Sequence, residues 1–440
     1  MAVLVAGGMC LLPFLQPRHL APLRAFYDEW LALALGCSAL LLAALGQRSR
    51  DAAIPTPALF LAAFSAFLAM RAVGGEATYL QSSALWACYA IFAALMLALG
   101  HDLSNAVGKE RVAVAISCCL LGGAVANALI GILQVTGIPT WLSAYVAHPQ
   151  GTRATGNVGQ ANLYANYLAL GAASLAYLYS KAKVSTTMAF ALGLVIALGS
   201  SLAGSRASLL YAIGFSALAL ATARPPAGET MLRLRSAALA YAAFAMLTQW
   251  LVPSGLGLLG FRTEGGFVRN DTPLQSGPLT DEASRLRLSA WASAFRIFLD
   301  APWFGVGPDE FPGAAFQMGL PPELAGTQLW TSPHNLILQL LCETGLSGTI
   351  PVVAAIAAWL FGLRRQFKES REPTLWWITA CVGVELTHSL LEFPLWHAHF
   401  LAVTALLMGL GASGSIRVPA WCARATYVGA AGSGALAAKS

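Results

Sequence analysis

The chain consists mainly of continuous apolar runs separated by short polar connections. Runs close to the roughly 20 residues that a helix needs to cross a bilayer predict transmembrane helices. Polarity does not alternate within them, which in practice excludes a transmembrane β-barrel. The pattern therefore predicts an all-α integral membrane protein with about twelve transmembrane helices. The runs cover residues 1–16, 29–46, 55–72, 84–100, 112–136, 161–180, 184–202, 207–222, 236–252, 336–363, 374–391 and 394–412.

One connection departs from this pattern, because a polar interval of roughly 80 residues separates the ninth run from the tenth. It extends from Leu251 to Thr331, and its length predicts a functional segment rather than a simple link. Residues 284–299 within it have the spacing of an amphipathic helix. The arginines of the interval are Arg262, Arg269, Arg285, Arg287 and Arg296.

Composition supports the membrane assignment. Charged residues make up 10% of the chain and hydrophobic residues 57%, whereas about a quarter of the residues of a soluble domain are charged. The pattern divides the chain into N-terminal transmembrane helices (1–250), a large outward loop containing amphipathic helices (251–335), C-terminal transmembrane helices (336–412) and a flexible tail (413–440).

The distribution of cations predicts the orientation, because connections rich in Lys and Arg face the cytoplasm. The 26 Lys and Arg residues divide 16 to 10 between alternate sides, and every lysine belongs to the larger set. That side is expected to be cytoplasmic and to hold both termini, so the long loop is expected outside. The first run ends at Gln16, Pro17 and Arg18 without a small-residue cleavage site, which favours a retained helix.

The cysteines and the net charge add little. The eight cysteines lie mostly inside apolar runs without metal-ligand spacing, so neither a disulfide framework nor a zinc site is expected. The net charge of +6 reflects the cytoplasmic cations, and no nucleic-acid partner is predicted.

Polar groups recur at the outward ends of helices, where they cost free energy unless they are paired or functional. In the stretch 151–162, Arg153, Asn157 and Gln160 precede a helix. An arginine beside a helix N-terminus is suited to bind an anion, so these residues are predicted to contact the substrate. The alternative is a polar turn in which Asn162 caps the helix.

Further arginines are candidates for the same anion. Arg206 lies in a very short outward turn, with interfacial snorkelling as the alternative. Arg287 lies four residues before Trp291 on the expected amphipathic helix, near Arg285. The alternative for this helix is a lid with its arginines at headgroup level. Convergent guanidiniums, each able to bind two oxygens, favour a phosphate-rich substrate.

His334 lies at the outward end of the tenth run and can exchange a proton near neutral pH. It is predicted to act in catalysis or substrate contact, with a structural hydrogen bond as the alternative. His388 and Glu392 are four residues apart, so they can pair across one helical turn. Both are also predicted to contact the substrate.

Two groups of titratable residues leave their roles open. The first could hold a metal, but acid–histidine pairs more often join helices, and no metal is predicted. It consists of Glu385, His388, Glu392, His397 and His399. The second frames an outward loop near the N-terminus and either positions an acceptor or anchors the second helix. It consists of His19, Pro22, Asp28 and Glu29.

Several stretches resemble the O-antigen ligase/polymerase superfamily. Its members are multi-span inner-membrane enzymes that handle undecaprenyl-diphosphate-linked glycans in the periplasm. The resemblance rests on RLRLSAWASAFRIFLDAPWFGVGPDEF and SPHNLILQLLCETGLSG. Three other stretches resemble the protein O-oligosaccharyltransferase branch: PRHLAPLRAFYDEWLA, RATGNVGQANLYANYLAL and HSLLEFPLWHAHFLAVTALL. Together the resemblance covers nearly the whole chain to residue 412.

The resemblance implies roles for individual residues. His334 corresponds to the family's essential loop histidine, Arg287 to its loop arginine and Arg206 to the arginine of the short outward turn. Many members have His-Asn-His-Asn at the histidine motif. This chain has Ser332, Pro333, His334 and Asn335 in that place, so the second histidine is missing.

The implied reaction is en bloc transfer of a glycan from undecaprenyl diphosphate to an acceptor hydroxyl at the periplasmic side of the inner membrane. The expected acceptor is a Ser/Thr of a pilin-like protein, with lipid A-core or another lipid-linked glycan as alternatives. Arg206, Arg287 and Arg153 are expected to stabilise the departing diphosphate without a metal or other cofactor. His334 would be the base or a phosphate contact.

An apolar groove between the helices is expected to hold the polyprenyl tail of the donor, and membrane lipids surround the protein. A function from another class is a flippase for lipid-linked sugars. It would favour internal repeats and polar residues at mid-membrane. The sequence has no convincing repeat, which favours the enzyme.

Overall fold

The structure is a computed structural model that describes residues 1–20, 23–46, 52–74, 79–148, 153–223, 228–258, 282–319, 331–419 and 427. Within these ranges the chain is almost entirely helical. Each apolar run of the sequence coincides with a helix, or at the N-terminus with a helix followed by a short 3-10 turn. The prediction of an all-α membrane protein is confirmed at this level.

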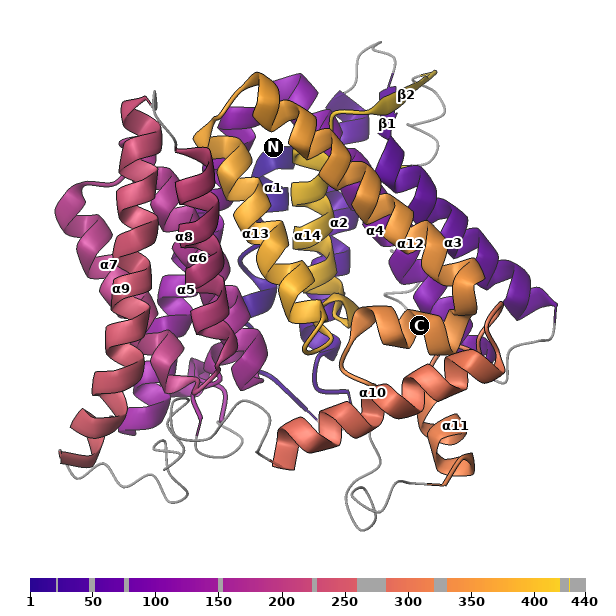
Figure 1. Ribbon diagram of the computed structural model, residues 1–440. Coiled ribbons are helices and arrows are strands. Elements are labelled where there is room, and N and C mark those ends of the chain that lie inside the picture. Colours follow the sequence, from indigo (N-terminus) through magenta and orange to yellow (C-terminus); the bar gives the residue numbers. More distant parts are fainter. Residues whose placement is uncertain are drawn as a thin grey trace.

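The helices before the large loop form two groups (Figure 1). Helices α5 to α9 lie at one side of the molecule, and α3 and α4 lie at the other. The helical segments before the large loop are α1 (Ala2–Met9), η1 (Pro13–Leu15), α2 (Phe26–Gly46), α3 (Thr56–Val73), α4 (Leu80–Val107), α5 (Lys109–Thr136), η2 (Ser143–Tyr145), η3 (Gly156–Val158), α6 (Ala161–Ser180), α7 (Thr186–Leu202), α8 (Ala207–Thr222) and α9 (Glu229–Leu258).

The C-terminal helices connect these two groups. Helix α13 packs on α6, α14 packs on α4, and α12 packs on α3. Helix α10 crosses beneath the ends of α13 and α14 (Figure 1). The turn between α13 and α14 therefore lies where both groups and α10 meet. The bounds are α10 (Glu282–Asp300), α11 (Phe311–Gln317), α12 (Leu336–Glu369), α13 (Pro373–Ser389), η5 (Pro394–Trp396) and α14 (Ala398–Leu410).

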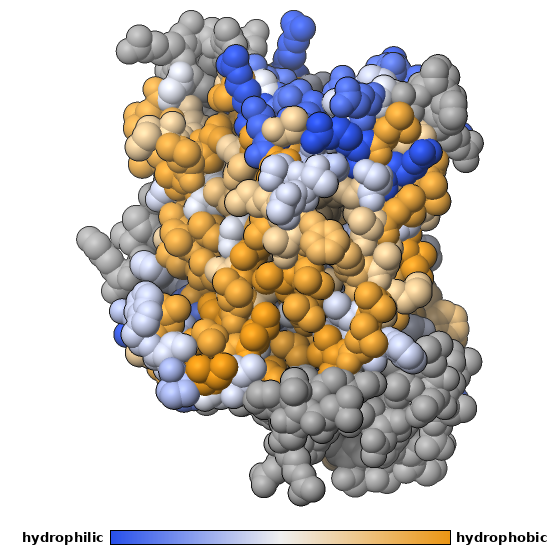
Figure 2. All heavy atoms as spheres, turned by 90° about the vertical axis from the view of Figure 1, so that its left-hand side faces the viewer, coloured by the Kyte–Doolittle hydropathy of each residue, from blue (hydrophilic) through white to orange (hydrophobic). Residues whose placement is uncertain are grey.

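The surface of the bundle is apolar enough for a bilayer. By length and composition, α2, α3, α4, α5 and α12 could each cross a membrane, and α7, α8 and α14 are shorter apolar helices. On the side that carries α7 and α9, hydrophobic residues form a broad band with hydrophilic residues above it (Figure 2). Exposed side chains of these two helices include Met188, Phe190 and Met246. Apolar surface of this extent is typical of contact with lipid rather than water.

A small sheet lies in a stretch for which the sequence predicts a flexible tail. Strand β2 (Ser415–Val418) pairs antiparallel with β1 (Ala52–Pro55). Farther on, the buried Tyr427 donates a hydrogen bond to Asp102 Oδ2 at 2.7 Å. The expectation of a flexible tail rests on the Ala, Gly and Ser of this region, whereas Ser415–Val418 alternates polar and apolar residues, as a strand does. Pairing with β1 gives this short segment its order.

Residues assigned to the cytoplasmic connections are brought together. Lys109 Nζ donates to Gln366 Oε1 at 2.8 Å, and Lys181 lies 2.9 Å from Glu110. These contacts join the α4–α5 connection, the end of α6 and the end of α12. They are consistent with one common face for these connections, while the side of the membrane that they face stays a prediction.

Helix α12 is broken at Gly345, and the turn between α10 and α11 fits into the break. Gly345 has φ 61° and ψ −165°, which is not helical geometry. Backbone hydrogen bonds of 2.8–3.0 Å join residues 302–307 to residues 342–347. A Cβ on Gly305 or on Gly345, both at positive φ, would collide with the opposite backbone. The two glycines therefore determine where α10 meets the start of α12.

Replacing Gly345 by alanine is expected to destabilise the protein by roughly 2 kcal/mol or more, because the left-handed conformation and the backbone collision add up. Thermal unfolding in detergent, followed by tryptophan fluorescence, measures this loss. Gly383→Ala in α13 is the matched control, since a Cβ there meets no atom within 4 Å. Equal melting temperatures for the two variants would contradict this account of the break.

Candidate active site

His334 is held in an uncommon backbone conformation at the start of α12. Its φ of 52° lies in the left-handed region, which non-glycine residues seldom adopt. The His334 amide donates to Ser332 Oγ at 3.0 Å. Asn335 caps the helix, because its Oδ1 accepts from the amides of Ile337 and Leu338 at 3.1 Å. These local bonds fix the direction in which the imidazole leaves the backbone.

Glu392, just beyond the end of α13, is the centre of the site. Its Oε2 lies 2.8 Å from His334 Nδ1. Its Oε1 accepts from Arg287 Nη2 at 2.9 Å and from Asn162 Nδ2 at 2.8 Å. Side chains from α6, α10 and the start of α12 therefore meet at one carboxylate. The structure brings together His334, Arg287 and Glu392 from the residues that the sequence singled out.

Arg153 joins the same network through Asn162. Arg153 Nη2 donates to Asn162 Oδ1 at 2.9 Å, and its Nε donates to the Ala203 carbonyl at 2.6 Å. Ala203 begins the short turn between α7 and α8, and Arg206 ends that turn as the residue before α8. Arg206 thus belongs to the turn that Arg153 binds, while Arg287 approaches from the other side of Asn162.

The electrostatics of the cluster favour an ionised Glu392. Only 7% of its side chain is exposed, against 22% for His334 and 35% for Arg287. Burial opposes ionisation, but the hydrogen bond with His334 and the positive charges outweigh it and lower the pKa of Glu392. An ionised carboxylate only accepts hydrogen bonds, so His334 Nδ1 has to be the donor. Nε2 is then the nitrogen at which His334 gains or loses a proton.

Helix α10 confirms the amphipathic helix that the sequence predicts, and it is fixed against the His334 loop. Trp291 Nε1 donates to the Pro333 carbonyl at 2.9 Å. Arg287, one turn before Trp291, reaches Glu392 from the same side of the helix. The buried side of α10 packs against α11 and α12 through Ala290, Ala294, Ile297, Phe311, Ala315 and Cys342.

His388 and Glu392 are bonded differently from the predicted side-chain pair, and that prediction is corrected. His388 Nδ1 is bonded to the hydroxyl of Tyr211. The two residues share a backbone bond, in which the Glu392 amide donates to the His388 carbonyl at 2.8 Å. The physical reason is that α13 ends at Ser389, so the chain leaves the helix before Glu392. His388 is 1% exposed and lies behind the site.

Two amide side chains predicted as substrate contacts hold the loop before α6. Asn157 Nδ2 donates to two backbone carbonyls at 2.9 and 2.8 Å. Gln160 Oε1 accepts from the Leu163 amide at 2.8 Å, so Gln160 caps α6 in place of Asn162. This leaves Asn162 available to Glu392 and Arg153. Because both amides are used within the protein, we leave Asn157 and Gln160 out of the proposed substrate site.

Among the remaining loop arginines, the structure describes the side chain of Arg296. Arg285 belongs to α10, but its side chain lies outside the described part of the chain, as do Arg262 and Arg269. Arg296 is exposed on α10. Among the described residues, no three His, Cys, Asp or Glu side chains are arranged to hold a metal ion.

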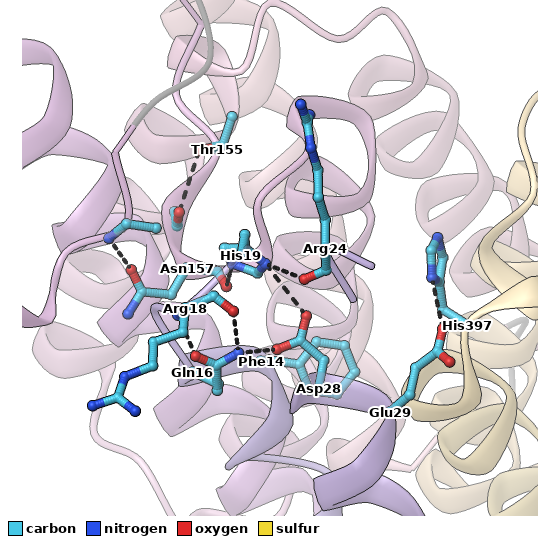
Figure 3. A network of polar contacts seen from close by, with 12 residues as sticks. Phe14, Gln16, Arg18, His19, Arg24, Asp28, Glu29, Thr155, Asn157 and His397 are labelled. Atoms are coloured by element: carbon cyan, nitrogen blue, oxygen red, sulfur yellow. Dashed lines mark hydrogen bonds and ion pairs between the residues drawn. The ribbon is translucent and has the colours of Figure 1, made fainter. Parts of the chain in front are cut away.

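The segment before α2 is anchored to Asn157 in the loop before α6 and to Asp28 in α2 (Figure 3). His19 Nε2 lies 3.0 Å from the Asn157 carbonyl, and its Nδ1 lies 3.6 Å from Asp28 Oδ2. Gln16 Nε2 donates to the other oxygen of Asp28 at 3.0 Å. Of the two roles predicted for this group, anchoring α2 is the one that His19 and Asp28 perform.

Glu29 makes different contacts from its neighbour Asp28. Its Oε1 lies 3.3 Å from His397 Nδ1 (Figure 3). Its Oε2 accepts from the hydroxyl of Tyr89. The ring of Phe393 lies 5.0 Å from that of His334 and 6.1 Å from that of His397. Phe393 thus separates the Glu29 group from the His334 group.

A cavity of about 320 Å³ lies between α3, α4, α12 and α14. The residues that line it include Leu336, which is two residues after His334, and Trp396. Most of the described residues that line it are apolar, Glu29 and Asp309 contribute carboxylates, and none is Lys, Arg or His. The cavity is therefore apolar apart from two carboxylates, and one of them, Glu29, is connected to His334 through His397 and Phe393.

Sequence reasoning missed Asn162 and Phe393 as parts of the site and assigned Glu392 to the substrate rather than to its neighbours. A usable signal was present in the stretch HSLLEFPLW. Glu392 there is a lone acid between the end of an apolar run and Pro394, on the side of the chain that also carries the arginines. A buried acid in that place needs cationic partners.

Comparisons with known proteins show which families this chain is similar to. Residues 170–353 match the family model described as O-antigen ligase. Residues 376–437 match the model described as the C-terminal part of virulence factor membrane-bound polymerases. The chain is 26% identical over 419 residues to the general O-oligosaccharyltransferase of Acinetobacter baylyi, which covers 93% of this chain and 69% of that protein.

Proposed function

We propose that this chain, which belongs to the O-antigen ligase superfamily, transfers a glycan en bloc from undecaprenyl diphosphate to the Ser/Thr hydroxyl of a pilin-like protein. The observation that carries the proposal is the single carboxylate, Glu392, that joins His334 to Arg287. The proposed location is the bacterial inner membrane, with this site at the periplasmic face. Lipid A-core is the alternative acceptor, because the family model is that of O-antigen ligases.

The arginines account for the donor half of the reaction. Breaking the bond between the anomeric carbon and the diphosphate oxygen leaves negative charge on the diphosphate. Guanidiniums that are already in place stabilise such charge in a partly dehydrated site. Arg287 on α10, Arg153 before α6 and Arg206 before α8 lie on three separate segments, and we assign them to the diphosphate. No metal ion or other cofactor has a role in this proposal.

His334 accounts for the acceptor half. Glu392 accepts a hydrogen bond from His334 Nδ1, so Nε2 can take the proton of the acceptor hydroxyl. The oxygen of that hydroxyl then attacks the anomeric carbon. The departing diphosphate then receives that proton, so the reaction needs no net acid or base. This arrangement favours the role of base over a phosphate contact for His334.

The polyprenyl tail of the donor lies along α8 in this proposal. Arg206 immediately precedes this helix, and Leu210 and Ile213 on its first turns are 49% and 61% exposed. A diphosphate at Arg206 would therefore have an apolar helix surface beside it. Lateral access of this kind lets a lipid-linked donor bind without leaving the bilayer.

The proposal is tested with purified protein, a lipid-diphosphate-linked glycan and two acceptors, a pilin-like protein and lipid A-core. We expect glycan transfer to the pilin-like protein, detected as a mass increase on a gel, and equal rates with and without EDTA. Transfer to lipid A-core alone would establish the alternative. A loss of activity in EDTA that Mg²⁺ restores would overturn the metal-independent mechanism.

A further inference from the structure

We propose that the cavity lined by Glu29 and Asp309 is the acceptor subsite, and that it selects an uncharged or cationic apolar peptide segment carrying a hydroxyl. This inference rests on the proposed function and extends it to the class of acceptor. It places the acceptor on the opposite side of His334 from the donor diphosphate. Glu29 would hold the acceptor and would not itself react.

The charges around His334 are divided between two sides. Arg287 and the Arg153–Asn162 pair reach Glu392 from α10 and α6. On the other side, beyond the ring of Phe393, His397 is paired with Glu29, which also accepts from Tyr89, and the ring of His399 lies 5.5 Å from that of His397. A substrate pair consisting of one dianion and one neutral hydroxyl fits such a division, because each partner is attracted to a different side.

The cavity has the chemistry of a site for a neutral amphiphile. Its walls are apolar, and its polar end carries Glu29, Tyr89 and Asp309 beside Trp86 and Trp396. Trp86 Nε1 donates to Asp309 Oδ1 at 3.3 Å, and the rings of the two tryptophans meet edge to face at 5.1 Å. Carboxylates accept hydrogen bonds from hydroxyl, amide and ammonium groups but repel phosphate. A phosphorylated lipid A-core is therefore disfavoured here.

Glu29 is accessible enough to meet a ligand. Its side chain is 24% exposed and that of His397 is 20% exposed, whereas the adjacent Asp28 is 4% exposed and already bonded to Gln16. The nearby guanidiniums of Arg18 and Arg24 point away from Glu29 and His397 (Figure 3). Of the two acids in the first turn of α2, Glu29 is therefore the one that lines the cavity.

The position of the cavity also suits the chemistry. Leu336 in its wall is two residues from His334 along the chain, and the ring of Phe393 contacts the imidazole. A peptide would bind in the cavity with its hydroxyl near Glu29. Phe393 lies between that position and His334, so the hydroxyl would move past its ring to react. The acceptor could then leave or be replaced without displacing the diphosphate from the arginines.

The test compares Glu29→Gln with its matched neighbour Asp28→Asn. The probe is an uncharged serine peptide with apolar flanks, and KM is measured separately for peptide and for lipid-linked donor. We expect Glu29→Gln to raise the KM of the peptide by about tenfold, the effect of losing one charge-assisted hydrogen bond. Glu29→Gln should change the KM of the donor by less than about twofold. Asp28→Asn should change the KM of the peptide by less than about twofold.

A second variant and a binding measurement keep the result decisive. Ala405→Phe fills the cavity from α14, and its melting temperature reports whether it folds. If Ala405→Phe or Glu29→Gln raises the KM of the donor instead, the cavity holds the polyprenyl tail and the inference is wrong. Calorimetric binding of the peptide without donor separates the two proposals. Peptide binding that Glu29→Gln weakens supports the subsite even if no transfer occurs, whereas transfer to lipid A-core without peptide binding overturns it.

Discussion

His334→Ala and Arg287→Ala are each expected to lower glycan transfer by roughly 10²-fold or more while the protein still inserts and accumulates. The loss of a general base lowers rates by roughly 10²- to 10⁴-fold. The loss of one preorganised donor to a developing anion lowers them by roughly 10²- to 10³-fold. Initial rates with purified variants in lipid nanodiscs measure both effects. Membrane yield and melting temperature show whether the fold is retained.

Matched controls are available on the same face of the protein. Arg296 lies on α10 with Arg287, and it is exposed rather than bonded to Glu392. His148 is an exposed histidine outside the cluster. Arg296→Ala and His148→Ala should therefore keep rates within about twofold of the unmodified protein. Full activity of His334→Ala or Arg287→Ala would refute the assigned roles.

Glu392→Gln is expected to lower kcat by roughly 10- to 100-fold, because the partner that orients the histidine loses its charge. The amide keeps the shape of the side chain, but one of its two ends is a donor. An amide nitrogen in the place of Oε2 would lose the bond from His334, and one in the place of Oε1 would lose the bonds from Arg287 and Asn162. The donor KM should also rise, since Arg287 loses its anchor.

A double-mutant cycle distinguishes this role from direct substrate contact. If Glu392 acts through Arg287, the effects of Glu392→Ala and Arg287→Ala should be far from additive, because each removes the same arrangement. Additive losses would instead indicate that Glu392 binds the substrate independently. Rates of the two single variants and the double variant decide between these outcomes.

The pH dependence of stability provides a further check on the Glu392 prediction. Its pKa in the folded protein is lowered, so this carboxylate stabilises the fold above its ordinary pKa and loses that contribution as pH falls through the folded value. Wild-type protein should therefore lose stability below about pH 4.5, the ordinary value for Glu. Glu392→Gln should lose less over the same range, as measured by thermal unfolding.

Local sequence determined most of the helices and the identity of the chemical groups. Continuous apolar runs specify helices in a bilayer because every backbone polar group must be bonded within its own segment. The same reasoning located α10 and Arg287 from amphipathic spacing, and it selected Arg153, Arg206 and His334 from their positions at helix ends. These features depend on neighbours within a few residues along the chain.

Tertiary structure decided which of these groups meet. Glu392 contacts side chains from α6, α10 and the start of α12, and no spacing along the chain links those positions. The end of α13 turned Glu392 away from His388, and Gln160 took the cap that would have used Asn162. Strand β2 formed because β1 lay beside it.

The physical reason for this division is the range of the interactions involved. Helix formation and hydropathy act within a segment, so they can be read from composition and periodicity. The partners of a buried charge depend on which helix ends converge, because a carboxylate such as Glu392 is stabilised by whatever donors the packing brings within about 3 Å. Sequence alone therefore specified the helices and the reactive groups, and the packing of α6, α10, α12 and α13 joined them into one site.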